Sequence, residues 1–154
     1  MRFNIRRSRV IAVLALVALG PYRSAAAQGA SPLGRWRTFD DKTNQLKSIV
    51  EIFTAGDELR GRVARVFAPP AKSPNPICEG CPGEFKDKPV VGMQILWGLK
   101  KDGSEYSGGR VFDPENRKTY RCKLIVVDGG KKLELRGFIG FSLIGRTQTW
   151  VRES

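Results

Sequence analysis

The feature that most constrains this chain is a series of short runs with strand-type composition, each closed by turn residues. The runs are rich in Val, Ile, Phe, Tyr and Trp, and dipeptides such as Asp102-Gly103 and Gly129-Gly130 separate them. Because glycine adopts positive φ at little cost, such dipeptides between apolar runs favour tight hairpins. Eight antiparallel strands are therefore predicted, over residues 33–39, 47–53, 59–67, 90–99, 105–112, 118–127, 132–139 and 143–152.

The predicted fold class is all-β, since no stretch after residue 27 combines a 3.6-residue apolar period with helix caps. A meander of eight strands must hide its two edges, because unpaired edges promote aggregation. Closure into a single antiparallel up-and-down β-barrel hides both, and a β-sandwich is the alternative. Alternation predicts three inward faces: Val91, Met93, Ile95, Trp97 and Leu99; Tyr120, Cys122, Leu124 and Val126; Leu133, Leu135, Gly137 and Ile139.

The first 27 residues have the three parts of a secretory signal peptide, in the expected order. Four arginines among the first nine residues precede an apolar run over 10–19, and the small residues 25–27 allow cleavage before Gln28. An uncleaved anchor is the alternative, but a spanning helix needs about 20 apolar residues. We therefore expect a mature domain of residues 28–154 that is not membrane-spanning and is exported, either periplasmic or secreted.

Removal of this leader changes the charge. The leader carries five basic residues and no acid, so the net charge falls from +12 for the whole chain to +7 for residues 28–154. The remaining Lys and Arg are spread singly along the predicted strands, and the densest stretch, 117–123, is short. This distribution is typical of a solvated surface, whereas a nucleic-acid site would interleave basic and aromatic residues. No nucleic-acid partner is predicted.

The segment 68–88 is a long connection with five prolines and two cysteines. Such loops tend to be lids, binding loops or disordered, and the cysteines argue that this one is tied down. A structural zinc site usually needs four Cys or His ligands, whereas this chain has three cysteines and no histidine. A disulfide between Cys78 and Cys81 is favoured, with Cys122 buried and free. A bridge from the loop to Cys122 is the alternative.

Catalytic groups are scarce. The absence of His excludes a Ser-His-Asp or Cys-His arrangement. The carboxylate pairs Asp40-Asp41 and Asp113/Glu115 lie in predicted turns, where Asp commonly accepts hydrogen bonds from its own backbone. Gly108-Gly109 lacks the rest of a phosphate-binding motif. We predict no catalytic residue, no metal and no cofactor, and we do not expect an enzyme.

Two aromatic motifs lie in the first and the last predicted strands. Gly34-x-Trp36 opens the first strand, and Trp150-Val151-Arg152 closes the last. The pattern resembles the lipocalin and wider calycin signature, in which an Arg from the last strand packs over the indole. A large indole under a guanidinium closes one end of a barrel. The resemblance implies a lipocalin- or fatty-acid-binding-protein-like barrel with Trp36, Trp150 and Arg152 as its end plug.

A closer resemblance covers nearly all of residues 28–154. It rests on nine segments in one order: 34–36, 48–52, 88–92, 95–99, 107–110, 113–116, 118–120, 136–140 and 145–150. Together they resemble the small exported bacterial proteins of domain of unknown function family 2147. The resemblance implies a calycin-like barrel and a periplasmic or secreted location, and it implies no established activity. Arg117 stands where that pattern usually has Gly, so we expect a less strained turn here.

Two functions fit such a barrel. The first is a carrier of a small apolar ligand, with the Pro-rich loop as a lid. The second is a cell-envelope interaction module whose barrel is filled by its own side chains and which acts through the loop. The expected partner is therefore a small hydrophobic ligand or an envelope component. The candidate pocket residues are Met93, Ile95, Trp97, Tyr120, Leu124 and Leu135.

Overall fold

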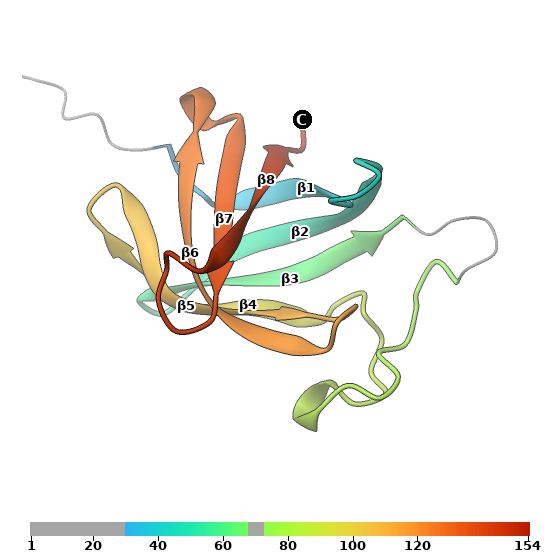
Figure 1. Cartoon of the computed structure of the whole chain (residues 1–154). Helices are drawn as coiled ribbons and strands as arrows, with labels where there is room; N and C mark the ends of the chain where they lie inside the picture. The colour runs from blue at the N-terminus through green and yellow to red at the C-terminus, as the bar shows by residue number, and fades with distance from the viewer. Residues whose placement is uncertain (1–29, 68–72) are drawn as a thin grey trace, which may run out of the picture.

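The protein is a closed barrel of eight antiparallel strands in sequence order, in which β8 returns to pair with β1 (Figure 1). The computed structural model describes residues 30–67 and 73–154, so the predicted signal peptide lies outside the described residues. Closure confirms the predicted all-β barrel and excludes the sandwich. The strands are β1 Gly34–Phe39, β2 Leu46–Ala55, β3 Glu58–Val66, β4 Gln94–Asp102, β5 Glu105–Asp113, β6 Lys118–Val127, β7 Lys132–Phe138 and β8 Gly145–Arg152.

Strand β6 spans the predicted residues, whereas β4 begins four residues later than predicted, at Gln94. The backbone N–H of Met93 donates to the carbonyl of Val90 at 3.1 Å, which folds this stretch into a turn. The neighbouring Gly92 N–H donates to Val63 O at 2.7 Å, which ties the turn to β3. The connection between β3 and β4 is therefore longer than the predicted loop.

The predicted inward face of β4 is wrong at its centre. Gly98 has φ of 74°, a left-handed conformation that interrupts the alternation of faces. Trp97 pairs with Arg110, which is exposed and pairs in turn with the exposed Arg121, so Trp97 lies on the outer surface. The inward position belongs to Leu96, which is fully buried. Two shifts in the β3–β4 register, on either side of Leu96, thus place the most conspicuous predicted pocket residue outside the barrel.

The faces of β6 and β7 follow the alternation more closely. Cys122 and Leu124 are both 1% exposed, and Leu124 pairs with Leu135 of β7. Ile139 is the exception, because β7 ends at Phe138 and Ile139 is 67% exposed in the following loop. The prediction of an inward Ile139 is therefore wrong.

The long connection is closed into a small ring by a disulfide, and aromatic stacking holds it against the barrel. Cys78 and Cys81 are bonded, with Cα atoms 5.6 Å apart, and Cys122 is buried and free, which confirms the favoured pairing. A single 3₁₀ turn, η1 Gly83–Phe85, carries Phe85 onto Phe112 of β5 with ring centroids 4.0 Å apart. The loop therefore has a fixed position beside the β5–β6 turn (Figure 1).

The turn between β5 and β6 is more strained than predicted. Arg117 has φ of 60°, a left-handed conformation that a side chain disfavours. Its guanidinium reaches the disulfide ring, since a Cβ built on Gly80 would lie 3.5 Å from Arg117 Nη1. The expectation of a relaxed turn is wrong, because Arg117 adopts the conformation that glycine would adopt more easily.

A second 3₁₀ turn, η2 Asp128–Gly130, joins β6 to β7 at the opposite end of the barrel. Among residues 30–67 and 73–154, no helix has the length and hydrophobicity needed to cross a membrane.

Candidate ligand-binding cavity

One end of the barrel is closed by Trp36 and Arg152. Trp36 is fully buried, and its Nε1 donates a hydrogen bond to the carbonyl of Pro32 at 2.8 Å. The guanidinium of Arg152 lies 4.1 Å from the centre of the indole. It also donates to three carbonyls, those of Gly130, Leu33 and Ser31, at 2.7, 2.9 and 2.6 Å. Arg152 thus joins the last strand, the β6–β7 turn and the residues that precede β1.

The other half of the barrel is hollow. A cavity of about 830 Å³ opens between the β1–β2, β5–β6 and β7–β8 connections and the disulfide-bonded loop. Its volume lies in the range of about 300–1,000 Å³ that is typical of sites for small molecules. The inner wall is apolar and comes from six strands: Val50, Val63, Ile95, Val111, Leu135 and Trp150.

A chain of polar contacts runs from the inner wall of the cavity to its mouth. The indole Nε1 of Trp150 donates to Gln148 Oε1 at 3.3 Å, and Gln148 Nε2 donates to Asp41 Oδ2 at 3.0 Å. Asp41 also forms an ion pair with Arg146. The chain places a hydrogen-bonding amide and a charged pair along one side of the cavity.

Further polar groups stand on the opposite sides of the mouth. The hydroxyls of Thr38 and Ser48 are hydrogen-bonded at 2.7 Å, and the hydroxyl of Tyr120 accepts from Asn116 Nδ2 at 2.8 Å. Among the hydrogen bonds of the described residues, the Tyr120 hydroxyl has no acceptor for its own proton. An apolar interior with polar groups at the mouth suits a molecule with a hydrocarbon body and one polar end.

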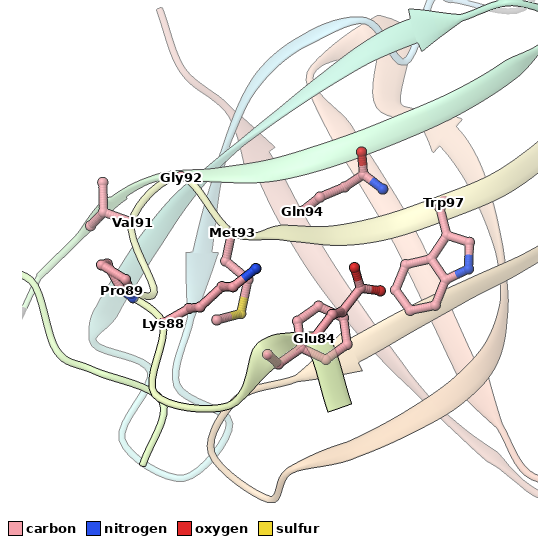
Figure 2. A pocket seen from close by; sticks show the side chains of 9 residues that line it. Glu84, Lys88, Pro89, Val91, Gly92, Met93, Gln94 and Trp97 are labelled. Atoms are coloured by element: carbon pink, nitrogen blue, oxygen red, sulfur yellow. The ribbon is translucent and has the colours of Figure 1, made fainter. Parts of the chain in front are cut away.

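The predicted pocket residues fall into three groups. Ile95, Tyr120 and Leu135 line the cavity, whereas Leu124 is 1% exposed and lies in the packed core outside the cavity lining. Met93 and Trp97 line a second, smaller pocket of about 440 Å³ between the long loop and β4 (Figure 2). The sequence pattern therefore grouped residues that the barrel separates.

The predicted plug residues are divided as well. Trp36 and Arg152 contact each other at the closed end, whereas Trp150 lines the cavity next to Leu133 of β7. Trp150 is 3% exposed, so its indole forms part of the boundary between the packed core and the hollow half.

Apart from Tyr120, the polar residues of the cavity were not predicted. Arg146, Gln148 and Trp150 occupy alternate positions on β8, and all three line the cavity. The signal that could have identified them is this period of two, which places a Gln and an Arg on the same face as a buried Trp. Thr38 gave no such signal, because its hydrogen bond to Ser48 depends on the pairing of β1 with β2.

The titratable groups offer little chemistry. Burial raises the pKa of the Cys122 thiol to about 12, so at neutral pH it is protonated and a poor nucleophile. Hydrogen bonds from the Thr43 backbone, the Thr43 hydroxyl and the Lys42 backbone lower the pKa of Asp40. Asp113 Oδ1 accepts from the Glu115 N–H at 2.9 Å. Both aspartates therefore stabilise their own turns, and residues 30–67 and 73–154 contain no group of three metal-ligating side chains.

Comparison with known proteins identifies the family. A family profile, described as an uncharacterized protein conserved in bacteria (DUF2147), matches residues 34–152, which is the whole barrel. The chain belongs to this family. This DUF2147 protein matches no curated protein.

A solved structure has the same fold. Protein HP1028 from Helicobacter pylori, described as belonging to the lipocalin family, superimposes with a TM-score of 0.69. The match covers 81% of this chain and 84% of that chain, at 21% sequence identity. At this identity the likeness shows that the DUF2147 barrel is lipocalin-like in fold.

Proposed function

We propose that the protein is an exported carrier that binds a small apolar molecule in the hollow half of its barrel. The observation that carries the proposal is the cavity of about 830 Å³, which is open at one end and closed by Trp36 and Arg152 at the other. The proposal includes cleavage of residues 1–27 and a periplasmic or secreted location, which the leader sequence supports.

The arrangement of polar groups defines the class of ligand further. Apolar side chains form most of the inner wall, while the polar ends of Tyr120, Gln148 and Arg146 contact Asn116 or Asp41 in the connections around the mouth. A hydrocarbon chain with a single polar or anionic head would therefore bind with the chain inside and the head beside these residues. Arg146 is already paired with Asp41, so the head needs to carry no full charge.

The alternative function was an interaction module with a filled barrel. Its defining expectation is the absence of internal space, and the cavity counts against it. The long loop keeps a place in the carrier proposal, because Ile77 and Cys78 belong to the wall of the mouth. There the loop acts as a fixed rim.

The test is to fill the cavity at one position. Gly137 lines the cavity without positive φ, and a Cβ there would meet Tyr120 Cβ at 3.7 Å and Val111 Cγ1 at 3.9 Å, which are ordinary contacts. Gly137→Phe should therefore insert a ring without backbone strain. We expect it to reduce binding of a brominated fatty acid at least about tenfold, measured by quenching of tryptophan fluorescence.

Two controls make this result specific. Gly137→Ala adds only the Cβ and should bind the probe within about twofold of the original protein. Trp150→Phe should remove most of the quenching while binding, measured by equilibrium dialysis, persists, because Trp150 is the indole that lines the cavity. Equal binding by Gly137→Phe and Gly137→Ala, or no binding by the unaltered protein across fatty acids and phospholipids, would contradict the carrier proposal.

A further inference from the structure

The loop between β7 and β8 exposes an unusual concentration of large apolar side chains. Ile139, Phe141, Leu143 and Ile144 are 67%, 80%, 89% and 73% exposed. The loop joins β7 to β8 and is drawn in red in Figure 1. Single exposed apolar residues are normal on a protein surface, whereas a contiguous group marks a site of interaction.

The exposure is maintained by hydrogen bonds to the backbone of the loop. Arg136 donates through Nε to the carbonyl of Ser142 at 2.7 Å and through Nη2 to that of Leu143 at 3.1 Å. Within the loop, the N–H of Ile144 donates to the carbonyl of Phe141 at 3.1 Å. Arg136 therefore holds the backbone in place while the apolar side chains remain in solvent.

A cluster of positive charge lies beside this loop on the outer surface of β5, β6 and β7. Arg110 of β5 pairs with Arg121 of the neighbouring β6, and Lys123 of β6 pairs with Arg136 of β7. Opposed like charges destabilise a sheet. Within the described residues Lys123 pairs with Glu105 at 2.9 Å, and the three arginines form no ion pair with an acidic side chain. We call Arg110, Arg121, Lys123 and Arg136 the basic patch.

From this juxtaposition we propose that the β7–β8 loop and the basic patch form a docking face for an anionic phospholipid bilayer. The apolar side chains of the loop would enter the outer part of the leaflet, and the patch would lie against the negatively charged headgroups. Each contribution alone is weak, but the two lie on contiguous surface and act together. A bilayer fits because the exposed apolar side chains of the loop stand beside three arginines that pair with no acidic side chain of the described residues.

The docking face lies next to the mouth of the cavity. Ile139 and Ile144 belong to the rim of the cavity as well as to the exposed loop. A barrel docked through this loop would bring its mouth to the lipid surface. The docking inference does not depend on the carrier proposal, because the loop and patch are exposed whether or not the cavity holds a ligand.

The experiment is flotation of the protein, expressed from the full chain, with vesicles of stated composition. We expect binding to phosphatidylglycerol–phosphatidylethanolamine vesicles that falls with added salt, and much weaker binding to phosphatidylcholine vesicles. The double variant Phe141→Ser/Leu143→Ser should lower the partition coefficient about tenfold or more. Arg110→Gln, which removes a cation that does not hold the loop, should lower it about fivefold.

Matched controls lie elsewhere on the barrel. Leu33→Ser removes an exposed apolar side chain at the closed end, and Lys101→Gln removes an exposed cation on β4. Both should bind within about twofold of the original protein. Thermal unfolding of every variant checks that the fold is retained.

Three results would overturn the docking inference. One is the absence of vesicle binding by the unaltered protein, and another is equal binding to neutral and anionic vesicles. The third is a loss of self-association in the Phe141→Ser/Leu143→Ser variant with unchanged vesicle binding, which would assign the loop to a contact between copies of the chain. Binding of the fatty-acid probe by the same variants reports separately on the carrier proposal, since none of them alters the inner wall of the cavity.

Discussion

The two halves of the barrel are built from the same eight strands, but one half is packed with side chains and the other is hollow. In the closed half, Trp36, Leu99 and Leu133 have no exposed surface, and Arg152 covers the indole from outside. In the open half, the inward residues line a cavity of about 830 Å³ and leave it unfilled. The difference shows how a single sheet forms a packed core at one end and an open cavity at the other.

The comparison also separates the kinds of residue that each half uses. The closed half depends on large apolar side chains, whose burial contributes about 1.5–3 kcal/mol each. The open half retains Gly137, Thr38 and Ser48 at inward positions, which add little apolar burial. We therefore expect substitutions in the closed half to affect the free energy of unfolding strongly and those in the open half to affect it weakly.

The largest effect is expected for Trp36→Ala. Removal of a fully buried indole leaves a large void and deprives Arg152 of the ring that it covers. The free energy of unfolding should fall by about 4 kcal/mol or more, measured by urea denaturation. Trp97→Ala serves as the control, because Trp97 lies on the outer surface and should cost about 1–2 kcal/mol. Similar losses for both variants would contradict the distinction between core and surface indoles.

A sharper comparison uses two leucines on the same strand. Leu133 faces the packed half, whereas Leu135, two residues later on the same face, lines the cavity. Leu133→Ala should cost about 3–4 kcal/mol and Leu135→Ala about 2 kcal/mol, because Leu135 already has empty space on one side. Urea denaturation measures both, and a larger loss at Leu135 would show that the open half is filled in solution.

Cys122 lies between Gly109 of β5 and Gly137 of β7, which makes it a probe of how well water is excluded between the halves. Its folded pKa of about 12 lies above its ordinary value of 9.0, so the folded state holds the proton more tightly. The resulting stability is intact below pH 9 and is lost as the pH rises toward 12. At pH 10 the loss is on the order of 1 kcal/mol.

The measurement is the free energy of unfolding at pH 8 and pH 10 for the original protein and for Cys122→Ala. Subtraction of the two pH differences cancels the titration of Lys side chains. No difference between the proteins would mean that water reaches the thiol and that the two halves are not sealed from each other.

The smallest effect is expected at the mouth. Arg117→Gly should raise the free energy of unfolding by about 1 kcal/mol, since glycine adopts positive φ without strain. Arg117→Ala is the matched control, because it also removes the guanidinium near Gly80 but keeps the strained backbone. Thermal melting compares the two, and equal stability would show that the turn carries no strain.

The sequence predicted most of the architecture but only part of the cavity. The sequence pattern predicted both ends of β6 correctly, because its ten residues contain no bulge and face the core on one side. The same rule was wrong for β4, since the left-handed Gly98 and two shifts in the register with β3 interrupt the alternation. Empty space depends on how far the strands are separated and where side chains end, and neither quantity is local to any segment of sequence.

The basic patch was missed for a related reason. Arg110, Arg121 and Arg136 are separated by eleven and fifteen positions in the chain, so they look dispersed along predicted strands. The register of β5, β6 and β7 brings them onto one surface. A prediction of register, and not only of strand positions, was needed to find them.

The contacts of Arg152 have a practical consequence for how the molecule can be attached to something else. Arg152 binds the carbonyls of Ser31 and Leu33, and its neighbour Glu153 pairs with Arg35 at 2.7 Å. The first and last residues of the folded domain therefore both lie at the closed end of the barrel. A fusion partner or an immobilising tag joined to either end would sit behind the barrel, so that the mouth and the β7–β8 loop would face away from the point of attachment.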